Sequence, residues 1–147
     1  MALNGKISPP PLVFYTRRDP SGAEFVLLAG EDTPETGPLP RAPEDRTQYE
    51  AVLNHCHLFP GPLRPRKLAE ARRAGLAAAR SLRDSLARAF PGKRFAVFLT
   101  VSPEDVILRF HQLWPGEPPY YEVRGQVERD ADDAHTDIYA FYTDSAE

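Results

Sequence analysis

A long amphipathic segment in the middle of the chain constrains the fold more than any other sequence feature. From Pro65 to Phe90, apolar and small residues recur at steps of three and four, and arginines fill most of the remaining arc. This spacing predicts an amphipathic helix of about seven turns that buries one face against a core. Pro65 suits its first turn, and Pro91 and Gly92 end it. The expected buried face consists of Leu68, Ala71, Gly75, Ala79, Leu82, Leu86 and Phe90.

The segment that follows this helix predicts a β-hairpin. Residues 94–101 and 105–113 are rich in β-branched and aromatic side chains, and residues 102–104 form a compact turn between them. The first of these strands is apolar on both faces, so we expect it at the centre of a sheet. Arg109 and His111 lie on one face of the second strand, which predicts that this face is wetter.

Shorter apolar runs predict strands towards both ends of the chain. Residues 12–16 and 24–29 predict an N-terminal hairpin, because the Asp-Pro-Ser-Gly run between them is a turn signal. Residues 138–143 predict a last strand, and residues 120–123 predict a further short one.

A short helix is predicted between the N-terminal hairpin and the long helix, at residues 47–55. Asp45 or Thr47 would cap it. The preceding residues 30–45 are rich in proline and acidic residues and show no periodicity, which predicts a long loop. The expected apolar face of the short helix comprises Tyr49, Val52 and Leu53.

These elements together predict one α+β domain that spans residues 1–147. Their order is ββααββ(β)β, so the N-terminal hairpin, the C-terminal hairpin and the last strand form a mostly antiparallel sheet. Such a grouping of strands and helices is typical of a sheet packed on helices, and we expect the long and the short helix on the same face. The chain's 16 prolines mark loops and sheet edges, because proline donates no ladder hydrogen bond.

Cysteine content and hydropathy bear on the cellular location. Cys56 is the only cysteine, so the chain cannot form an internal disulfide, which is typical of a reducing cytosol. No apolar run has the length of a signal peptide or approaches the roughly 20 residues of a membrane span. We therefore predict a cytoplasmic protein that does not contact a membrane.

Charge is distributed unevenly along the chain, although the net charge is only −3. Residues 64–94 hold ten Lys or Arg against two acids, a local net charge of +8, and residues 117–147 hold nine acids against two Arg, a local net charge of −7. No nucleic-acid recognition motif accompanies the arginines. We therefore interpret the basic helix face as solvated and partly paired with the acidic tail, and we expect no nucleic-acid partner.

The run His55-Cys56-His57 is the strongest candidate for a metal site. Two imidazoles and a thiolate are good ligands for zinc or copper. Alternating residues of a strand point the same way, so both histidines could share an ion there, which a helix would prevent. His111 is a further candidate ligand from a distant part of the chain. The alternative interpretation is a helix end in which Cys56 is a small core residue, and it implies no cofactor.

Aromatic and acidic residues after the C-terminal hairpin form the candidate partner-binding surface. Tryptophan and tyrosine are enriched at interface hot spots, and clustered acids would attract a basic partner. A competing interpretation is that the tryptophan covers the open end of the core. The predicted partner-binding residues are Trp114, Glu117, Tyr120, Tyr121, Asp130, Asp132 and Asp133.

The sequence favours a non-enzymatic protein-binding module. It contains no glycine-rich phosphate loop, no nucleophile-elbow motif and no zinc-protease motif. A small acidic domain with exposed aromatic residues is similar in character to the cytosolic immunity proteins and antitoxins of bacteria, and a basic toxin domain would be a fitting partner. One alternative is a small metal-binding protein or enzyme that uses His55, Cys56, His57 and His111. Another is a homo-oligomeric structural protein joined through a sheet edge or the Trp114 loop.

Overall fold

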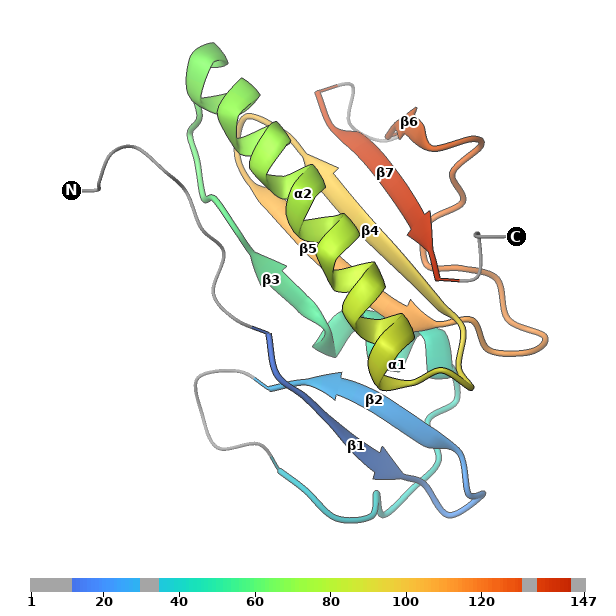
Figure 1. Cartoon of the computed structure of the whole chain (residues 1–147). Coiled ribbons are helices and arrows are strands. Elements are labelled where there is room, and N and C mark those ends of the chain that lie inside the picture. The colour runs from blue at the N-terminus through green and yellow to red at the C-terminus, as the bar shows by residue number, and fades with distance from the viewer. Residues whose placement is uncertain (1–11, 30–34, 131–134, 144–147) are drawn as a thin grey trace.

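The computed structural model describes residues 12–29, 35–130 and 135–143, and it confirms the predicted α+β class. Within these residues two helices and seven strands follow one another along the chain (Figure 1). They are β1 (Phe14–Arg18), β2 (Glu24–Leu28), α1 (Arg46–Leu53), β3 (His55–His57), α2 (Pro65–Ala89), β4 (Phe95–Val101), β5 (Val106–Gln112), β6 (Val127–Arg129) and β7 (Asp137–Tyr142).

The described strands form two antiparallel sheets rather than one. The larger sheet has five strands in the order β3-β5-β4-β7-β6, and β1 pairs only with β2. The central place predicted for residues 94–101 is confirmed, because β4 lies between β5 and β7, with Leu99 opposite Leu108 on one side and Tyr139 on the other. Six of the seven residues of β4 are buried, as expected of a strand that is apolar on both faces.

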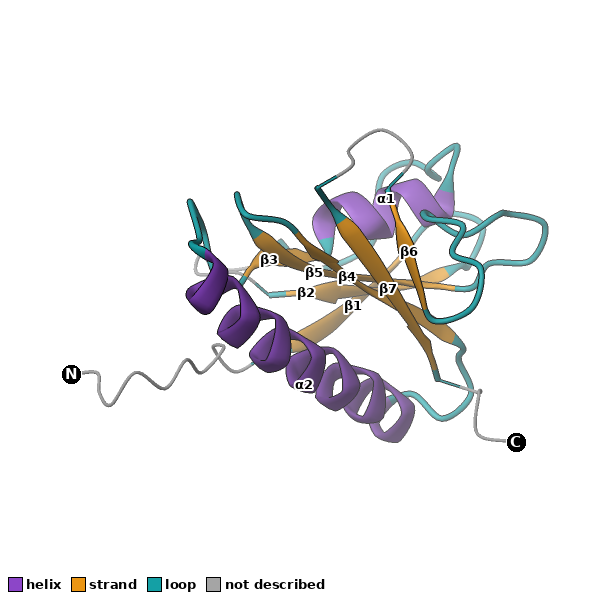
Figure 2. Cartoon of the chain, turned by 90° about the horizontal axis from the view of Figure 1, so that it is seen from above, coloured by secondary structure: helices purple, strands orange, loops and turns teal. Residues whose placement is uncertain are grey.

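The two helices lie on opposite faces of the larger sheet, so the prediction of a shared face is wrong (Figure 2). α2 crosses the face formed by Val97, Leu99, Leu108 and their neighbours. Gly75 permits its close approach: a Cβ atom there would lie 3.1 Å from methyl groups of Leu99 and Val106. The buried residues of α2 are Ala71, Gly75, Ala79, Leu82 and Leu86, which confirms most of the predicted face.

The other face of the larger sheet is covered by α1 and by the connection after β5. Ala96, Phe98, Ile138 and Ala140 form the buried layer on this side. Residues packed on this layer are Leu113, Tyr120, Tyr121, Val123 and Tyr142. The predicted wetter face of β5 is confirmed at Ile107 and Arg109, which are partly exposed, but not at His111, which the connection leaves only 1% exposed.

The short helix α1 buries a different face from the predicted one. Val52 and Leu53 remain 43% and 49% exposed. The buried residues are instead Thr47, Glu50 and Ala51. Asp45 is the N-cap, as one of the two predicted alternatives had it, and its side chain accepts a hydrogen bond from the Gln48 N–H. The prediction from the apolar pattern is wrong here because a polar side chain on the buried face of α1 accepts hydrogen bonds from the strands on both sides.

Glu50 joins the N-terminal hairpin to the larger sheet. One carboxylate oxygen accepts hydrogen bonds from the Val26 N–H at 2.9 Å and the Gln112 side-chain amide at 2.7 Å. The other accepts from the Gln112 N–H at 2.7 Å and the Trp114 indole N–H at 2.9 Å. Burial raises the pKa of this carboxyl, and the same N–H donors oppose the rise. Four donors match the four lone-pair positions that a carboxylate offers, so the buried group is fully satisfied.

Asn54, one helical turn after Glu50, completes this junction. Its side chain accepts from the Leu28 N–H at 2.8 Å and donates to the Val26 carbonyl at 2.9 Å. On the other side, the Phe110 N–H donates to the Asn54 carbonyl at 3.1 Å. α1 and its C-cap therefore supply β2 and β5 with hydrogen bonds that a neighbouring strand would otherwise supply.

Several short elements differ from the sequence predictions. Residues 55–57 form the edge strand β3 rather than a helix end, with Cys56 opposite Leu108. Residues 120–123 are irregular, because the Tyr120 N–H donates to the His111 ring at 3.0 Å and not to a strand. The additional strand is β6, which pairs with β7.

The expected pairing of the basic helix with the acidic tail occurs at one point of the described residues. Arg72 donates hydrogen bonds to Asp137 at 3.0 Å and to the Tyr139 hydroxyl at 2.7 Å. Neither described helix combines the length and the apolar character that a membrane span needs.

Candidate functional site

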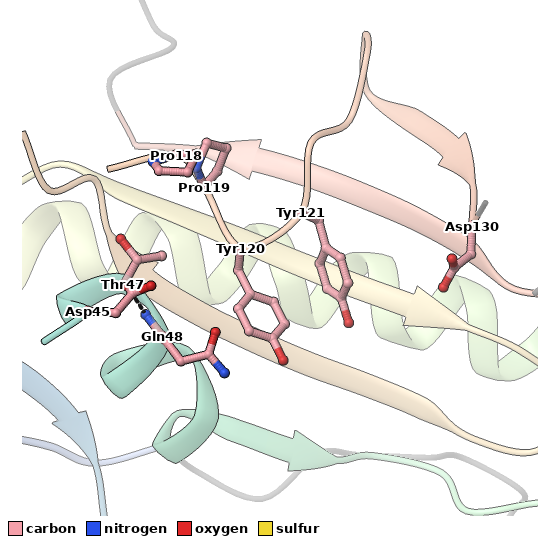
Figure 3. Close-up of a pocket in the computed structure, with 8 residues that line it drawn as sticks. All are labelled: Asp45, Thr47, Gln48, Pro118, Pro119, Tyr120, Tyr121 and Asp130. Atoms are coloured by element: carbon pink, nitrogen blue, oxygen red, sulfur yellow. Dashed lines mark hydrogen bonds between the residues drawn. The ribbon is translucent and has the colours of Figure 1, made fainter. Parts of the chain in front are cut away.

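A cleft of about 540 Å³ opens between the start of α1 and the connection that follows β5. Figure 3 shows that α1 contributes one side of it and that the rings of Tyr120 and Tyr121 lie in the middle, pointing the same way. Asp130 lies at the opposite end from Asp45. The residues that line the cleft are Asp45, Thr47, Gln48, Pro118, Pro119, Tyr120, Tyr121 and Asp130.

Residues of β4 and β5 hold the two tyrosines of the cleft in place. Their ring centres are 4.9 Å apart in an edge-to-face arrangement, and Tyr121 makes a similar contact with Phe98 at 5.3 Å. The Arg109 guanidinium lies 4.7 Å from the centre of the Tyr120 ring and donates a hydrogen bond to the Ala51 carbonyl. Burial raises the pKa of the Tyr121 hydroxyl, so this group stays protonated and can donate at neutral pH. Rigid aromatic side chains lose little conformational freedom when a partner binds.

Carboxylates lie at both ends of this tyrosine pair. Asp45 is tied to α1 as its N-cap, with 2.9 Å between its oxygen and the Gln48 nitrogen. The backbone of Asp130 is fixed by a 2.8 Å hydrogen bond from its N–H to the Thr136 carbonyl. An aromatic pair between two acids suits the end of a cationic side chain, which can contact both kinds of group.

Glu117 supports the cleft instead of lining it. Its carboxylate accepts from the Arg46 N–H at 3.2 Å, the Thr47 N–H at 2.8 Å and the Thr47 hydroxyl at 2.7 Å. These groups lie at the start of α1, where backbone N–H groups lack partners within the helix. Glu117 therefore fastens the connection after β5 to the first turn of α1. Burial raises its pKa, but the hydrogen bonds from Thr47 and Arg46 outweigh burial and lower the pKa below its ordinary value.

This lowered pKa predicts a pH-dependent effect of Glu117→Gln. A carboxyl whose folded-state pKa lies below its unfolded value stabilises the fold above the unfolded pKa and loses that contribution as the pH falls through the folded value. We expect the substitution to lower the free energy of unfolding by about 0.5–1 kcal/mol at pH 7, because the group is partly solvated. Urea titrations from pH 7 to pH 2.5 should show that the free energies of unfolding of the wild type and the variant become equal at the acid end. The same difference in free energy at every pH would contradict this role.

Trp114 packs mainly against its own chain. Its ring centre lies 5.1 Å from that of Phe25, and the Arg46 guanidinium covers the ring at 5.3 Å. Its indole N–H is bonded to Glu50. The side chain belongs to the cluster beneath the N-terminal hairpin that includes Leu27 and Leu39. The competing interpretation, in which the tryptophan covers the core, therefore describes most of its contacts.

The structure brings together only part of the predicted partner-binding set. Tyr120, Tyr121 and Asp130 line one cleft, and Trp114 and Glu117 lie behind it. Asp132 and Asp133 lie outside the described residues. Sequence reasoning missed Asp45, Thr47 and Gln48, which reach the cleft from α1. Their only sequence signal was the N-cap pattern, which predicts a helix start and says nothing of a site.

The four candidate metal ligands separate into different surroundings. His55 and His57 are exposed neighbours on β3, with ring centres 5.2 Å apart. Cys56 points to the opposite face, since its register partner is Leu108, and burial raises the pKa of its thiol. His111 is buried, and both of its ring nitrogens are hydrogen-bonded. Among the described residues, no group of three or more His, Cys, Asp or Glu is placed to hold a metal ion.

Comparisons of this chain with protein-family models, with curated proteins and with solved structures gave no match.

Proposed function

We propose that this protein is a non-enzymatic, cytoplasmic protein-binding module that acts like an immunity protein or antitoxin and covers a basic site on a partner such as a toxin domain. One observation carries the proposal: two ordered tyrosines lie between two carboxylates in an open cleft. Tyrosine is among the residues that contribute most binding energy at protein interfaces. Paired acids favour a basic partner and reject an acidic one.

The chemistry of the cleft points to a lysine or arginine side chain of the partner. Its cationic end would contact the carboxylate at one end of the cleft, Asp45 or Asp130, and its methylene stem would pack on the tyrosine rings. The hydroxyl of Tyr121 and the amide of Gln48 could bond the partner's backbone. Because Arg109 and Phe98 already hold the rings, binding would cost little ordering.

The proposal is tested by affinity capture from an extract of the source cells. The immobilised wild-type protein is compared with Asp130→Lys, which reverses a charge in the cleft, and with Glu122→Lys. Glu122 is exposed, lies close in sequence and does not line the cleft, so it is a matched control for the change of charge. We expect one partner to be retained by the wild type and Glu122→Lys, and its dissociation constant to rise at least about tenfold with Asp130→Lys.

Thermal melting of the three proteins provides the necessary control for folding. All three proteins should remain folded at the temperature of the capture experiment, and Glu122→Lys should melt within about 2 °C of the wild type, because exposed substitutions usually change stability by less than 0.5 kcal/mol. A partner retained equally by all three proteins would contradict the assignment of the cleft. Capture of the chain by a second copy of itself, with a concentration-dependent mass, would favour the homo-oligomeric alternative instead.

A further inference from the structure

We propose that His55 and His57 form a binding site for one divalent transition-metal ion of the copper, nickel and zinc group. The proposal is independent of the partner-binding cleft, since neither histidine lines it. It also differs from the set expected from the sequence, because Cys56 and His111 take no part. The site is a two-histidine site with open coordination positions.

The backbone places the two histidines on one face of an edge strand. β3 pairs with β5, with His55 opposite Arg109 and His57 opposite Ile107, so both side chains leave the same side of the sheet. Both residues are exposed, and the His57 side chain is 53% accessible. An ion could therefore reach both rings without any rearrangement of the core.

Hydrogen bonds select the tautomer that leaves a ligand atom on each ring. His55 Nδ1 lies 2.8 Å from the Val52 carbonyl, and His57 Nδ1 lies 2.6 Å from an Asp105 carboxylate oxygen. Both partners are acceptors, so each Nδ1 must carry the proton, and each Nε2 in the neutral ring keeps its lone pair. Metal-binding histidines commonly donate the other ring N–H to a carbonyl or carboxylate, which orients the ring and makes it more basic.

The separation of the rings fits a shared ion. Zinc lies about 2.0–2.1 Å from a coordinating imidazole nitrogen, so the ring centre lies roughly 3.2 Å from the metal, and two rings at a tetrahedral angle have centres roughly 5.2 Å apart. The observed distance between the ring centres is 5.2 Å. Imidazole ligands suit copper, nickel and zinc, and the general order of affinity places copper first.

The remaining candidate ligands do not complete this site. The Cys56 thiol points towards the α2 face of the sheet, and both ring nitrogens of buried His111 are occupied. Two coordination positions or more are thus left for water or for a ligand from outside the chain. Such an open site binds an ion more weakly than a closed four-ligand site.

Isothermal titration of the purified full chain with Cu²⁺ or Ni²⁺ alone, in a weakly coordinating buffer, tests the proposal. We expect one ion per chain, with Cu²⁺ bound more tightly than Ni²⁺. His55→Gln and His57→Gln should each weaken binding at least tenfold, and the double variant should abolish it. His135→Gln, an exposed histidine elsewhere, and Cys56→Ser serve as matched controls and should leave the affinity unchanged.

Electron paramagnetic resonance of the Cu²⁺ complex gives a second readout that does not depend on stability. We expect coupling to two imidazole nitrogens in the wild type and to one in each single variant. Binding that persists in the His55→Gln, His57→Gln double variant would overturn the proposal. Loss of binding in Cys56→Ser, or coupling to a single nitrogen in the wild type, would overturn it as well.

Discussion

Replacing Glu50 with alanine is expected to lower the free energy of unfolding by more than about 4 kcal/mol, the largest single effect anticipated for this chain. The carboxylate is completely buried and accepts four hydrogen bonds. Its removal leaves the N–H groups of Val26, Gln112 and Trp114 buried without their acceptor. Each such group costs roughly 1–3 kcal/mol, and a cavity adds to the loss.

Two further variants separate hydrogen bonding from volume. Glu50→Gln preserves the shape of the side chain but turns an amide NH₂ towards two N–H donors. Its free energy of unfolding should therefore lie between that of the wild type and that of the alanine variant. Glu44→Ala removes an exposed carboxylate nearby and should change stability by less than about 0.5 kcal/mol. Guanidinium titrations followed by circular dichroism measure all three. A cost below about 1 kcal/mol for Glu50→Ala would show that the junction between the sheets does not depend on this residue.

Trp114→Ala is expected to cost about 3 kcal/mol and to lower the melting temperature by roughly 6–12 °C. The indole packs on Phe25, lies beneath Arg46 and donates to Glu50, so its loss leaves a gap under the N-terminal hairpin. Differential scanning calorimetry measures the effect directly. A melting temperature that hardly changes would show that Trp114 is a surface aromatic, and would again favour the interpretation that it contacts a partner.

Trp114→Phe is the matched variant for this experiment. It keeps an aromatic ring against Phe25 and loses only the indole N–H and part of the volume, so we expect a cost of about 1–1.5 kcal/mol. The double variant with Glu50→Gln should cost less than the two single costs combined, because both residues share one hydrogen bond. Simple additivity would mean that this bond contributes nothing to stability.

The elements that sequence reasoning predicted well are long and strongly periodic. α2 was predicted at residues 65–90 and runs from Pro65 to Ala89. β4 and β5 follow it within a residue of their predicted limits. These segments carry enough repeats for their apolar period to be distinguished from chance, and proline and glycine mark their ends.

The elements that it missed are set by tertiary contacts. β3 and β6 have three residues each, too few to show any period, and their conformation follows from pairing with β5 and β7. In α1, the apolar residues Val52 and Leu53 stay exposed while Glu50 is buried. A hydrophobicity pattern cannot anticipate this, because the gain comes from hydrogen bonds to strands that are distant in sequence.

The candidate cleft was half visible in the sequence. Tyr120, Tyr121 and Asp130 were predicted from their residue types and their order along the chain. Asp45 and Gln48 come from a distant part of the sequence, and contacts such as the hydrogen bond between Glu117 and Thr47 place them beside the tyrosines. The residue types thus indicated that the site is aromatic and acidic, whereas the fold determines which other residues line it.

The most direct test of partner binding at this cleft is nuclear magnetic resonance of the isotope-labelled protein, titrated with the partner recovered by affinity capture. Binding at the cleft predicts that the largest changes in amide chemical shift fall at residues 45–48, 120, 121 and 130. It also predicts that Asp130→Lys removes them and Glu122→Lys does not. Shifts concentrated instead on the outer face of α2, with the cleft unperturbed, would contradict the proposed function.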